Sequence, residues 1–288
     1  MVYLILGKNG QVGRALEQTF AHAQPIALDR QSCDMAAPEQ IAAALEEYKP
    51  RVILNAAAYT AVDAAEDTPK TAEAINTLAP AILAEWAAAN DALLVHYSTD
   101  YVFDGTKGTP YTETDTPAPL SVYGTTKLAG EMAIQKSGCR HLIFRTSWVY
   151  DQAGKNFPNT ILRLAAERDA LTIINDQHGV PTHAALIADI TKHCVENFSP
   201  DKSGLYNLVP QGETTWHGIA EYLIKNSNIP LKCKVAHVQP IPSSAYPTKA
   251  MRPHNSRLDT TKLAQAFELK LPDWTEHLDG FIKNYSNK

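Results

Sequence analysis

The sequence has few cysteines, and they lie far apart. Its four cysteines are Cys33, Cys139, Cys194 and Cys233, and no two of them form a Cys-x-x-Cys pair. Structural zinc sites and disulfide-stapled domains need a denser, regularly spaced cysteine pattern. The pattern therefore favours a reducing compartment, and we expect a cytoplasmic protein without disulfides.

Long apolar runs and basic clusters are also missing. No stretch approaches the roughly 18–20 apolar residues needed to span a bilayer, and the opening segment MVYLILGKNG has no basic residue before its short apolar run. The net charge is −5 with no basic stripe, so neither a membrane nor a nucleic acid is an expected partner. His-Glu-x-x-His and Gly-x-Ser-x-Gly motifs are absent, which argues against a zinc hydrolase and a serine hydrolase.

What the sequence does have is a regular alternation of apolar strands and alanine-rich helices. Strands are expected at 2–7, 25–29, 51–57, 92–99 and 141–150, and helices at 11–21, 38–49 and 71–90. This order predicts an α/β fold with a doubly wound parallel sheet of the Rossmann type. We expect residues 1–150 to form the domain around this sheet. Residues 151–288 should form mainly a smaller substrate-binding lobe, with some segments returning to the sheet.

Two proline-rich stretches interrupt this alternation. Residues 104–120 and 230–256 contain three and five prolines respectively, which predicts loops or extended chain rather than helices. Long loops in a compact domain are usually functional. We expect the smaller lobe of the second half to close over the carboxyl ends of the strands, where open α/β sheets bind their ligands.

A glycine-rich turn follows the first expected strand. Gly7, Gly10 and Gly13 have the spacing G-x-x-G-x-x-G and precede a helix, so that a diphosphate can approach the free N–H groups at the helix start. Asp29 lies 22 residues beyond Gly7, where a carboxylate can hold the adenosine ribose. The combination predicts a bound dinucleotide, so residues 1–150 are the expected NAD(P)-binding domain.

The residues after Asp29 leave the choice of cofactor open. A carboxylate at this point favours the free ribose hydroxyl of NADH, whereas the adjacent Arg30 favours the phosphate of NADPH. We therefore expect either cofactor to bind. Asp34 is a candidate partner of the adenine amine, and the small residues in NAAAYT (55–60) allow the cofactor to pass closely.

The segment SVYGTTKLAGE (121–131) carries the candidate chemistry. Tyr123 and Lys127 are four residues apart and share one face of the expected helix. Thr99 ends the fourth strand and adds a hydroxyl at the same edge of the sheet. We expect Tyr123 to protonate a carbonyl oxygen, Thr99 to hydrogen-bond that oxygen, and Lys127 to lower the pKa of the phenol toward neutrality.

Taken together, these motifs resemble the extended short-chain dehydrogenases/reductases, and within them the dTDP-4-dehydrorhamnose reductases. The resemblance runs through essentially the whole chain. It rests on NAAAYTAVDAAE (55–66), YSTDYVFDG (97–105), VYGTTKLAGE (122–131), FRTSWVY (144–150), INDQHGVPT (174–182), GLYNLV (204–209) and RPHNSRLDT (252–260).

The resemblance implies an oxidoreductase of dTDP-rhamnose biosynthesis, a pathway that supplies lipopolysaccharide O-antigen or cell-wall polysaccharide. It would use NADPH or NADH to reduce the 4-keto group of dTDP-4-dehydro-6-deoxy-L-mannose to dTDP-L-rhamnose. The implied cofactor contacts are Gly10, Gln11, Val12, Asp29, Asp34, Met35, Ala58, Tyr59, Thr60, Tyr97, Tyr123 and Lys127. The implied sugar contacts are Thr99, Asp100 and Trp148, and Arg252 is a candidate partner of the diphosphate.

The chain departs from the family in one respect. Some members are dimers bridged by magnesium, held in part by a glutamate in the first turn of the first helix. Ala15 stands at that position, so no metal ligand is assigned and magnesium is not expected. Both a monomer and a homodimer remain open.

Two other functions stay possible at this stage. A nucleotide-sugar epimerase or dehydratase would use the same tyrosine and lysine, but dehydratases carry an acidic pair beside the threonine. Here Asp100 is followed by Tyr101, which supplies half of that pair. A non-catalytic subunit similar to the regulatory subunit of methionine adenosyltransferase is the second alternative, and the intact Thr99, Tyr123 and Lys127 weigh against it.

Overall fold

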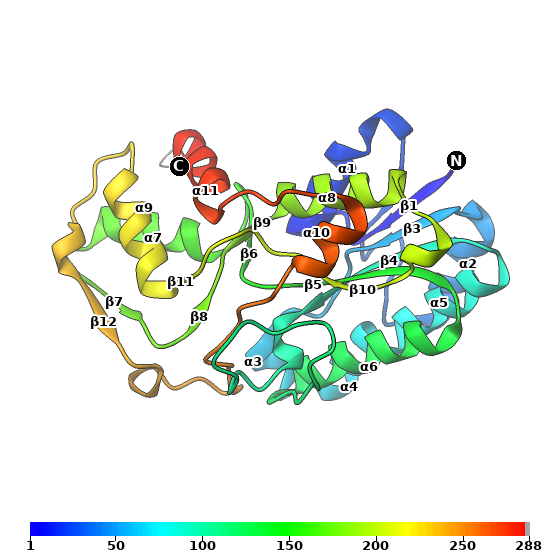
Figure 1. Ribbon diagram of the computed structural model, residues 1–288, viewed down its shortest axis with the longest axis horizontal. Coiled ribbons are helices and arrows are strands. Elements are labelled where there is room, and N and C mark those ends of the chain that lie inside the picture. The colour runs from blue at the N-terminus through cyan, green and yellow to red at the C-terminus, as the bar shows by residue number, and fades with distance from the viewer. Residues whose placement is uncertain (286–288) are drawn as a thin grey trace.

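A six-stranded parallel sheet forms the centre of the molecule, as a computed structural model describing residues 1–285 shows (Figure 1). The strands, in spatial order, are β10 (Gly204–Asn207), β5 (Arg140–Thr146), β4 (Leu93–Thr99), β3 (Val52–Asn55), β1 (Tyr3–Leu6) and β2 (Ile26–Leu28). The five strands expected in the first half are confirmed, with ends that differ by a few residues. The chain order reverses between β1 and β3, which makes the crevice beyond their carboxyl ends the expected ligand site.

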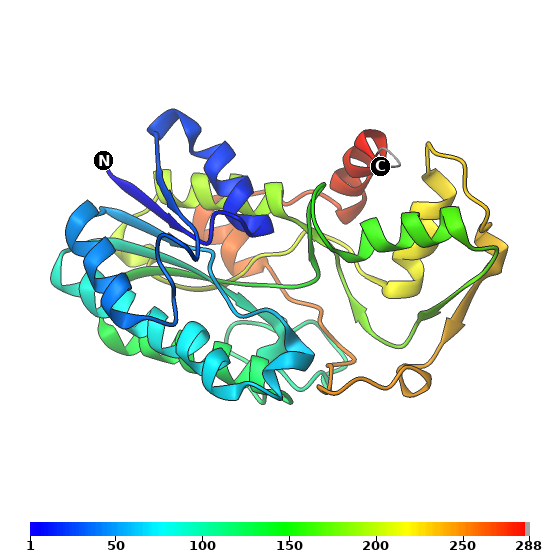
Figure 2. The ribbon, with the colours of Figure 1, turned by 180° about the vertical axis from the view of Figure 1, so that it is seen from behind.

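Helices cover both faces of this sheet (Figures 1 and 2). One face carries α1 (Gln11–Thr19), α8 (Ala184–Glu196) and α10 (Thr261–Phe267), and the other carries α2 (Pro38–Tyr48), α5 (Ala79–Ala89) and α6 (Val122–Ser137). Successive strand residues point to opposite faces, so Ile5 packs under α1 while Leu4 and Leu6 pack under α2. Burial on both sides explains why the strand sequences are apolar without alternation.

The expected helix at 71–90 is present but is not regular. It consists of α4 (Pro69–Glu73), a π-helical turn (Ala74–Leu78) and α5. The side chain of Asn76, in the wide turn, is bonded to the backbone of Tyr59. π-helical turns occur frequently at functional sites, and hydrophobic periodicity does not reveal them.

The second half of the chain forms a smaller layer of helices beside the sheet. α9 (Trp216–Asn226) packs on the strand pair β7 (Leu171–Ile174) and β12 (Val238–Ile241), and α7 (Phe157–Glu167) and α11 (Trp274–Asn284) pack against α9 in the same apolar core. Short pairs of β6 (Val149–Tyr150) with β9 (Thr182–His183), and of β8 (His178–Gly179) with β11 (Thr214–Thr215), lie near the connection. Three elements that follow residue 150 belong to the sheet domain. β10 is a strand of the central sheet, and α8 and α10 pack on one of its faces. The domain boundary itself remains a prediction.

The proline-rich segments take the expected form. Residues 104–120 contain no helix or strand, and Tyr111 forms an isolated bridge to Leu258. Residues 230–256 are largely extended and contain β12 with two short 3₁₀ turns. Within residues 1–285, no helix has both the length and the apolar character needed to cross a membrane.

Candidate functional site

The glycine motif lies where β1 leads into α1. Gly7 has a φ of +84°, and a Cβ atom there would lie 2.8 Å from the backbone of Ala57. Gly10 is the N-cap of α1, has no side-chain cap, and is followed by a first turn without acidic residues. The first N–H groups of a helix lack intrahelical partners, so this helix start fits a diphosphate.

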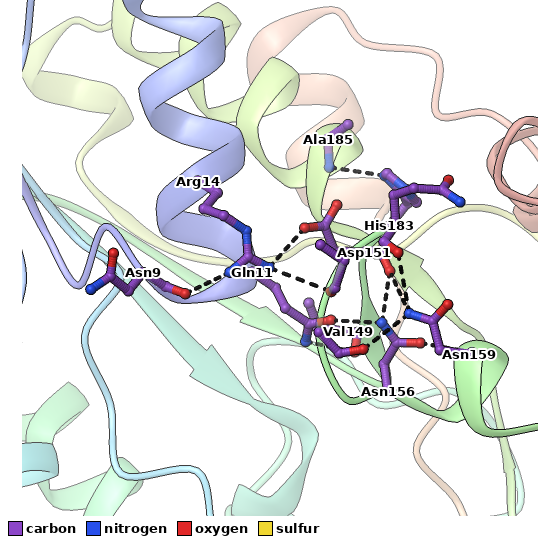
Figure 3. A network of polar contacts seen from close by, with 12 residues as sticks. Asn9, Gln11, Arg14, Val149, Asp151, Asn156, Asn159, His183 and Ala185 are labelled. Carbon is purple, nitrogen blue, oxygen red and sulfur yellow. Dashed lines mark hydrogen bonds and ion pairs between the residues drawn. The ribbon is translucent and has the colours of Figure 1, made fainter. Parts of the chain in front are cut away.

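The start of α1 is also bonded to the smaller lobe (Figure 3). Gln11 donates to the carbonyl of Val149 over 3.4 Å and accepts a hydrogen bond from Asn156. Arg14 forms an ion pair with Asp151 over 3.0 Å. The side chain of Gln11 thus holds the lobe, which leaves its backbone N–H as the group facing the expected diphosphate.

Asp29 and Arg30 lie at the end of β2, as expected. Asp29 accepts hydrogen bonds from Asn9 and from Ser32, and the contacts with Ser32 lower its pKa. Arg30 contacts Asp34 over 3.3 Å, but its side chain is 78% exposed. The carboxylate is therefore held in place, whereas the guanidinium is free to turn toward a ligand.

The segment that follows β3 is held in place by Asn76, a residue that the sequence motifs did not identify. Asn76 accepts from the backbone N–H of Tyr59 and donates to its carbonyl. The same amide donates to Thr126 on α6. Asn76 thereby ties the segment containing Ala58, Tyr59 and Thr60 to the helix that carries Tyr123 and Lys127.

Three of the expected cofactor residues direct their side chains into the hydrophobic core. Val12 and Met35 pack against opposite faces of the sheet. The hydroxyl of Tyr97 is bonded to Thr191 on α8 over 2.9 Å. The carbonyl of Tyr97 faces the other way and accepts from Lys127. The expected contact of Tyr97 with the cofactor stays a prediction, and its hydroxyl is engaged in the bond to α8.

Tyr123 and Thr99 meet because α6 begins close to the end of β4. Ser121 caps the helix through the N–H of Gly124. A Cβ atom on Gly124 would lie 2.2 Å from the carbonyl oxygen of Tyr101, so only glycine permits this approach. The rings of Tyr101 and Tyr123 pack edge to face at 5.5 Å, which orients the phenol toward the strand end.

Lys127 lies between α6 and β4, and only 1% of its surface is exposed. Its Nζ donates to the carbonyl of Tyr97 over 2.6 Å and lies 3.1 Å from Nε2 of His96. Burial lowers the pKa of Lys127 to about 8, and the charge of Glu131 on the next turn opposes this change. Lys127 is thus mainly an ammonium at neutral pH and loses that charge in mildly basic solution.

The expected lowering of the Tyr123 pKa is wrong for this structure. Burial raises the pKa of Tyr123 to about 12; the Thr99 hydroxyl opposes that shift, and the charge of Asp100 adds to it. The reason is that the Lys127 ammonium is directed to Tyr97 and His96, so desolvation of the phenol dominates. At neutral pH Tyr123 keeps its proton, which is the form that a proton donor needs.

Asp100 adjoins Thr99 and is 2% exposed. Its Oδ1 accepts from the Thr99 hydroxyl over 3.1 Å. Burial raises the pKa of Asp100 to about 6, although hydroxyls of Ser256 and Thr99 moderate the effect. A buried carboxylate at the edge of the site is therefore costly to ionise.

Replacing Asp100 by asparagine should stabilise the protein at neutral pH. Between about pH 4 and 6 the unfolded chain releases this proton while the folded state holds it, so the wild-type free energy of unfolding falls as pH rises. The gain from Asp100→Asn should therefore grow over this range and reach on the order of 3 kcal/mol above pH 6. Urea unfolding of both proteins from pH 4 to 8 measures it; a gain independent of pH would contradict the assigned pKa.

Trp148 and Arg252 lie on the lobe side of the site. Trp148 has an unusual φ of +47° and stacks on Trp216 with ring centroids 3.9 Å apart. Arg252 forms two hydrogen bonds with Asp63 of the short helix α3 (Val62–Ala65). Arg252 is thus engaged in an ion pair that joins the proline-rich segment to the sheet domain, and its part in binding a diphosphate remains a prediction.

The residues around Ala15 offer no metal site. Ala15 lies on the buried face of α1 and packs into the core. Across residues 1–285, no group of three histidine, cysteine, aspartate or glutamate side chains is arranged to hold a metal ion.

Comparisons with known proteins agree with this arrangement. A family model described as the RmlD substrate binding domain matches residues 1–287. The dTDP-4-dehydrorhamnose reductase of Shigella flexneri is 48% identical over 282 residues, which cover 95% of this chain and 94% of that protein. The reductase of Escherichia coli K12 is 48% identical over 284 residues, with the same coverage.

Solved structures extend the comparison to the fold. The dTDP-4-dehydrorhamnose reductase of Bacillus anthracis, in complex with NADP, superposes with a TM-score of 0.91 at 29% identity, covering 99% of both chains. WbmG of Bordetella bronchiseptica, in complex with NAD and UDP, shares the fold at 16% identity with a TM-score of 0.81. The chain belongs to the dTDP-4-dehydrorhamnose reductase family.

Proposed function

We propose that this protein reduces the 4-keto group of dTDP-4-dehydro-6-deoxy-L-mannose to give dTDP-L-rhamnose, with NADPH or NADH as reductant. The observation that carries the proposal is the convergence of Thr99, Tyr123 and Lys127 at the carboxyl end of β4, on the same edge of the sheet as the glycine turn after β1. We further propose that the enzyme acts in the cytoplasm, as a monomer or homodimer, on a dTDP-linked sugar.

The residues present fit a nicotinamide dinucleotide. Gly7, Gly10 and Gly13 bring the backbone close to the uncapped start of α1, and Asp29 provides a fixed carboxylate at the end of β2. When bound, the cofactor supplies the hydride that reduces the carbonyl carbon. The protein supplies the proton and the electrostatic environment.

Each of the three site residues has one task in this reaction. Tyr123 holds its proton at neutral pH and donates it to the carbonyl oxygen as negative charge develops there. Lys127 provides a buried positive charge one helical turn away, which stabilises the phenolate that remains. Thr99 now donates to Asp100 and must turn its hydroxyl to hydrogen-bond the substrate oxygen.

A coupled assay tests the proposal directly. With the keto-sugar supplied, NADPH or NADH absorbance should fall in proportion to dTDP-L-rhamnose formed. Turnover of a nucleotide sugar without net oxidation of NAD(P)H would instead indicate an epimerase or dehydratase. Absence of any turnover, with nucleotide binding retained, would favour the regulatory alternative.

The cofactor preference depends on Arg30. Because this side chain is exposed and next to Asp29, Arg30→Ala should weaken NADPH binding by about tenfold or more, the effect of losing one charge-assisted hydrogen bond, while NADH binding changes little. Titration of the protein fluorescence with each cofactor measures both dissociation constants. Arg51→Ala, at the other end of the sheet, is the matched control. An equal loss for both cofactors would show that Arg30 does not face the 2′-phosphate.

The contribution of Arg252 can be separated from that of its ion pair. If the guanidinium contacts the diphosphate, Arg252→Ala should weaken dTDP binding by about 10–100-fold, whereas Asp63→Asn, which keeps the arginine, should not. Calorimetric titration with dTDP in the presence of cofactor measures this. Equal losses in the two variants would show that Arg252 acts only by holding the proline-rich segment. We also propose that the Trp148 ring contacts the sugar, so Trp148→Ala should weaken dTDP-sugar binding.

A further inference from the structure

A buried chain of three polar side chains lies behind the proposed proton donor. Lys127 Nζ is 3.1 Å from His96 Nε2, and His96 Nδ1 is 3.1 Å from the side-chain amide of Asn55. Each of the three residues is 1% exposed. Neither the reaction described above nor the sequence motifs assign a role to His96 or Asn55.

The topology explains how these residues meet. His96 and Asn55 are paired in register on the neighbouring strands β4 and β3. Leu94, two residues before His96, packs in the core beneath α5 and α6, so His96 faces the same side. Lys127 reaches this face from α6. Because the three side chains are buried, most of their hydrogen-bond partners must come from within the protein.

The donors and acceptors of the chain determine the form of the imidazole. An ammonium donates three hydrogen bonds and accepts none, so Nε2 of His96 must be the bare nitrogen that accepts from Lys127. A neutral ring then carries its proton on Nδ1, which requires an acceptor. The Oδ1 of Asn55 is buried and has no hydrogen-bond partner. Turning the Asn55 amide by 180° exchanges its oxygen and nitrogen, so that the oxygen accepts from the Nδ1–H of His96. The hydrogen bonds of the neighbouring groups decide between the two orientations of the amide.

We propose that His96, held by Asn55 as its neutral Nδ1–H tautomer, is a positioning residue that orients Lys127 for the reduction proposed above. Nε2 of His96 and the carbonyl of Tyr97 occupy two of the three ammonium donors. Among residues 1–285 the third donor has no hydrogen-bond partner, so it is the one that a ligand at the strand ends can use. The proposal rests on the reductase function for its kinetic consequences, while the tautomer follows from the hydrogen bonds alone.

The charges around Lys127 are consistent with a neutral His96. The titratable groups on the surrounding elements include His96 and Tyr97 on β4, Arg145 on β5, and Tyr123 and Glu131 on α6. Glu66, at the end of α3, contacts the start of α6. Glu131 is paired with Arg145 over 2.6 Å, and Glu66 accepts from the N–H of Val122. Burial, and then the Lys127 charge, lower the pKa of His96 well below its usual value.

The tautomer can be observed without an activity assay. In ¹⁵N-histidine-labelled protein, the His96 resonances, assigned by their loss in His96→Gln, should report a neutral ring protonated at Nδ1 from pH 5 to 9. A proton on Nε2, or titration within this range, would overturn the proposal even if the protein proves to be an active reductase.

Kinetics separate positioning from packing. His96→Leu keeps the volume but removes the acceptor, so Lys127 should lose its proton more readily. The basic limb of the kcat profile should move down by about one pH unit, and kcat should fall about 10–100-fold with little change in the KM of the sugar. His96→Gln offers an amide oxygen to the ammonium and should restore much of both properties.

A matched control distinguishes this from general damage to the core. Leu94→Ala, on the same face of β4, should lower thermal stability and leave the pH profile unchanged. If His96→Leu behaves in the same way, with a wild-type pH profile, His96 is a structural residue only. If His96→Leu does not fold, the comparison of His96→Gln with wild type and the NMR tautomer still decide the question. Loss of reductase activity in the wild type itself would refute the proposed function, not the tautomer.

Discussion

Tyr123→Phe should lower kcat by about 10²–10⁴-fold, the usual contribution of general acid catalysis, and leave cofactor binding nearly unchanged. The substitution removes one hydroxyl and keeps the ring that packs edge to face on Tyr101. Because burial holds the pKa of Tyr123 at about 12, the wild-type phenol is protonated throughout the neutral range. The loss should therefore be the same at pH 6 and pH 7.5.

Tyr101→Phe provides the control for this prediction. Its ring lies beside Tyr123, but its hydroxyl is not assigned to the carbonyl oxygen, so kcat should change much less. Thr99→Val should reduce kcat by a smaller factor than Tyr123→Phe and spare cofactor affinity. A folded Tyr123→Phe variant with near-normal turnover would show that this tyrosine is not the proton donor.

The sequence was sufficient to predict the fold because the strands are buried on both faces. Segments such as Val52–Asn55 and Leu93–Thr99 are buried along their whole length. Strands that are covered on both faces have apolar side chains at successive positions, and such runs are recognisable in the sequence. Glycine spacing identified the turn after β1 for a similar reason. A Cβ atom on Gly13 would lie 2.1 Å from the Gly7 carbonyl oxygen, so the geometry leaves no other residue.

The polar contacts of the site were less predictable. Local spacing placed Tyr123 and Lys127 on one helical face, but which atoms the ammonium meets depends on how α6 docks on β4. Asn76 and His96 lie in segments that read as an ordinary helix and an ordinary strand, and only the tertiary structure brings them to the site. The predicted shift in the Tyr123 pKa failed for the same reason, because desolvation is a property of the packed structure.

Apolar packing holds β10, α8 and α10 on the central sheet, and polar contacts around the proposed cofactor site join further segments of the second half to the sheet domain. Gln11 and Arg14 at the start of α1 bond to the segment that begins the lobe, and Arg252 bonds to Asp63 on the opposite side. Gln11 and Arg14, which follow the glycine turn of the proposed cofactor site, thus also hold the smaller lobe in place. This arrangement gives a physical reason to measure cofactor and sugar binding separately in every variant.

Lys127→Met should damage the enzyme more broadly than Tyr123→Phe. The substitution removes the positive charge that stabilises the phenolate and the one ammonium donor not used by Tyr97 and His96, while methionine fills most of the side-chain volume. We expect kcat to fall by at least about 10²–10⁴-fold and cofactor affinity to fall by about tenfold, the effect of losing a hydrogen bond to a charged group.

The pH profile of Lys127→Met distinguishes loss of this charge from loss of structure. The pKa of Lys127 is lowered from 10.5 to about 8 in the folded protein, so wild-type activity should decline as pH rises through about 8. With methionine, that limb should move upward, toward the pKa of Tyr123.

A lowered lysine pKa also means that the buried ammonium lowers the free energy of unfolding below pH 8, by on the order of 3 kcal/mol. Replacing Lys127 by methionine removes this cost, which should offset the loss of the two hydrogen bonds to Tyr97 and His96. The melting temperature at pH 7 should therefore not fall. Stopped-flow turnover from pH 6 to 10, cofactor titration and thermal unfolding measure the three properties. A basic limb that stays near pH 8 in this variant would show that another group controls it.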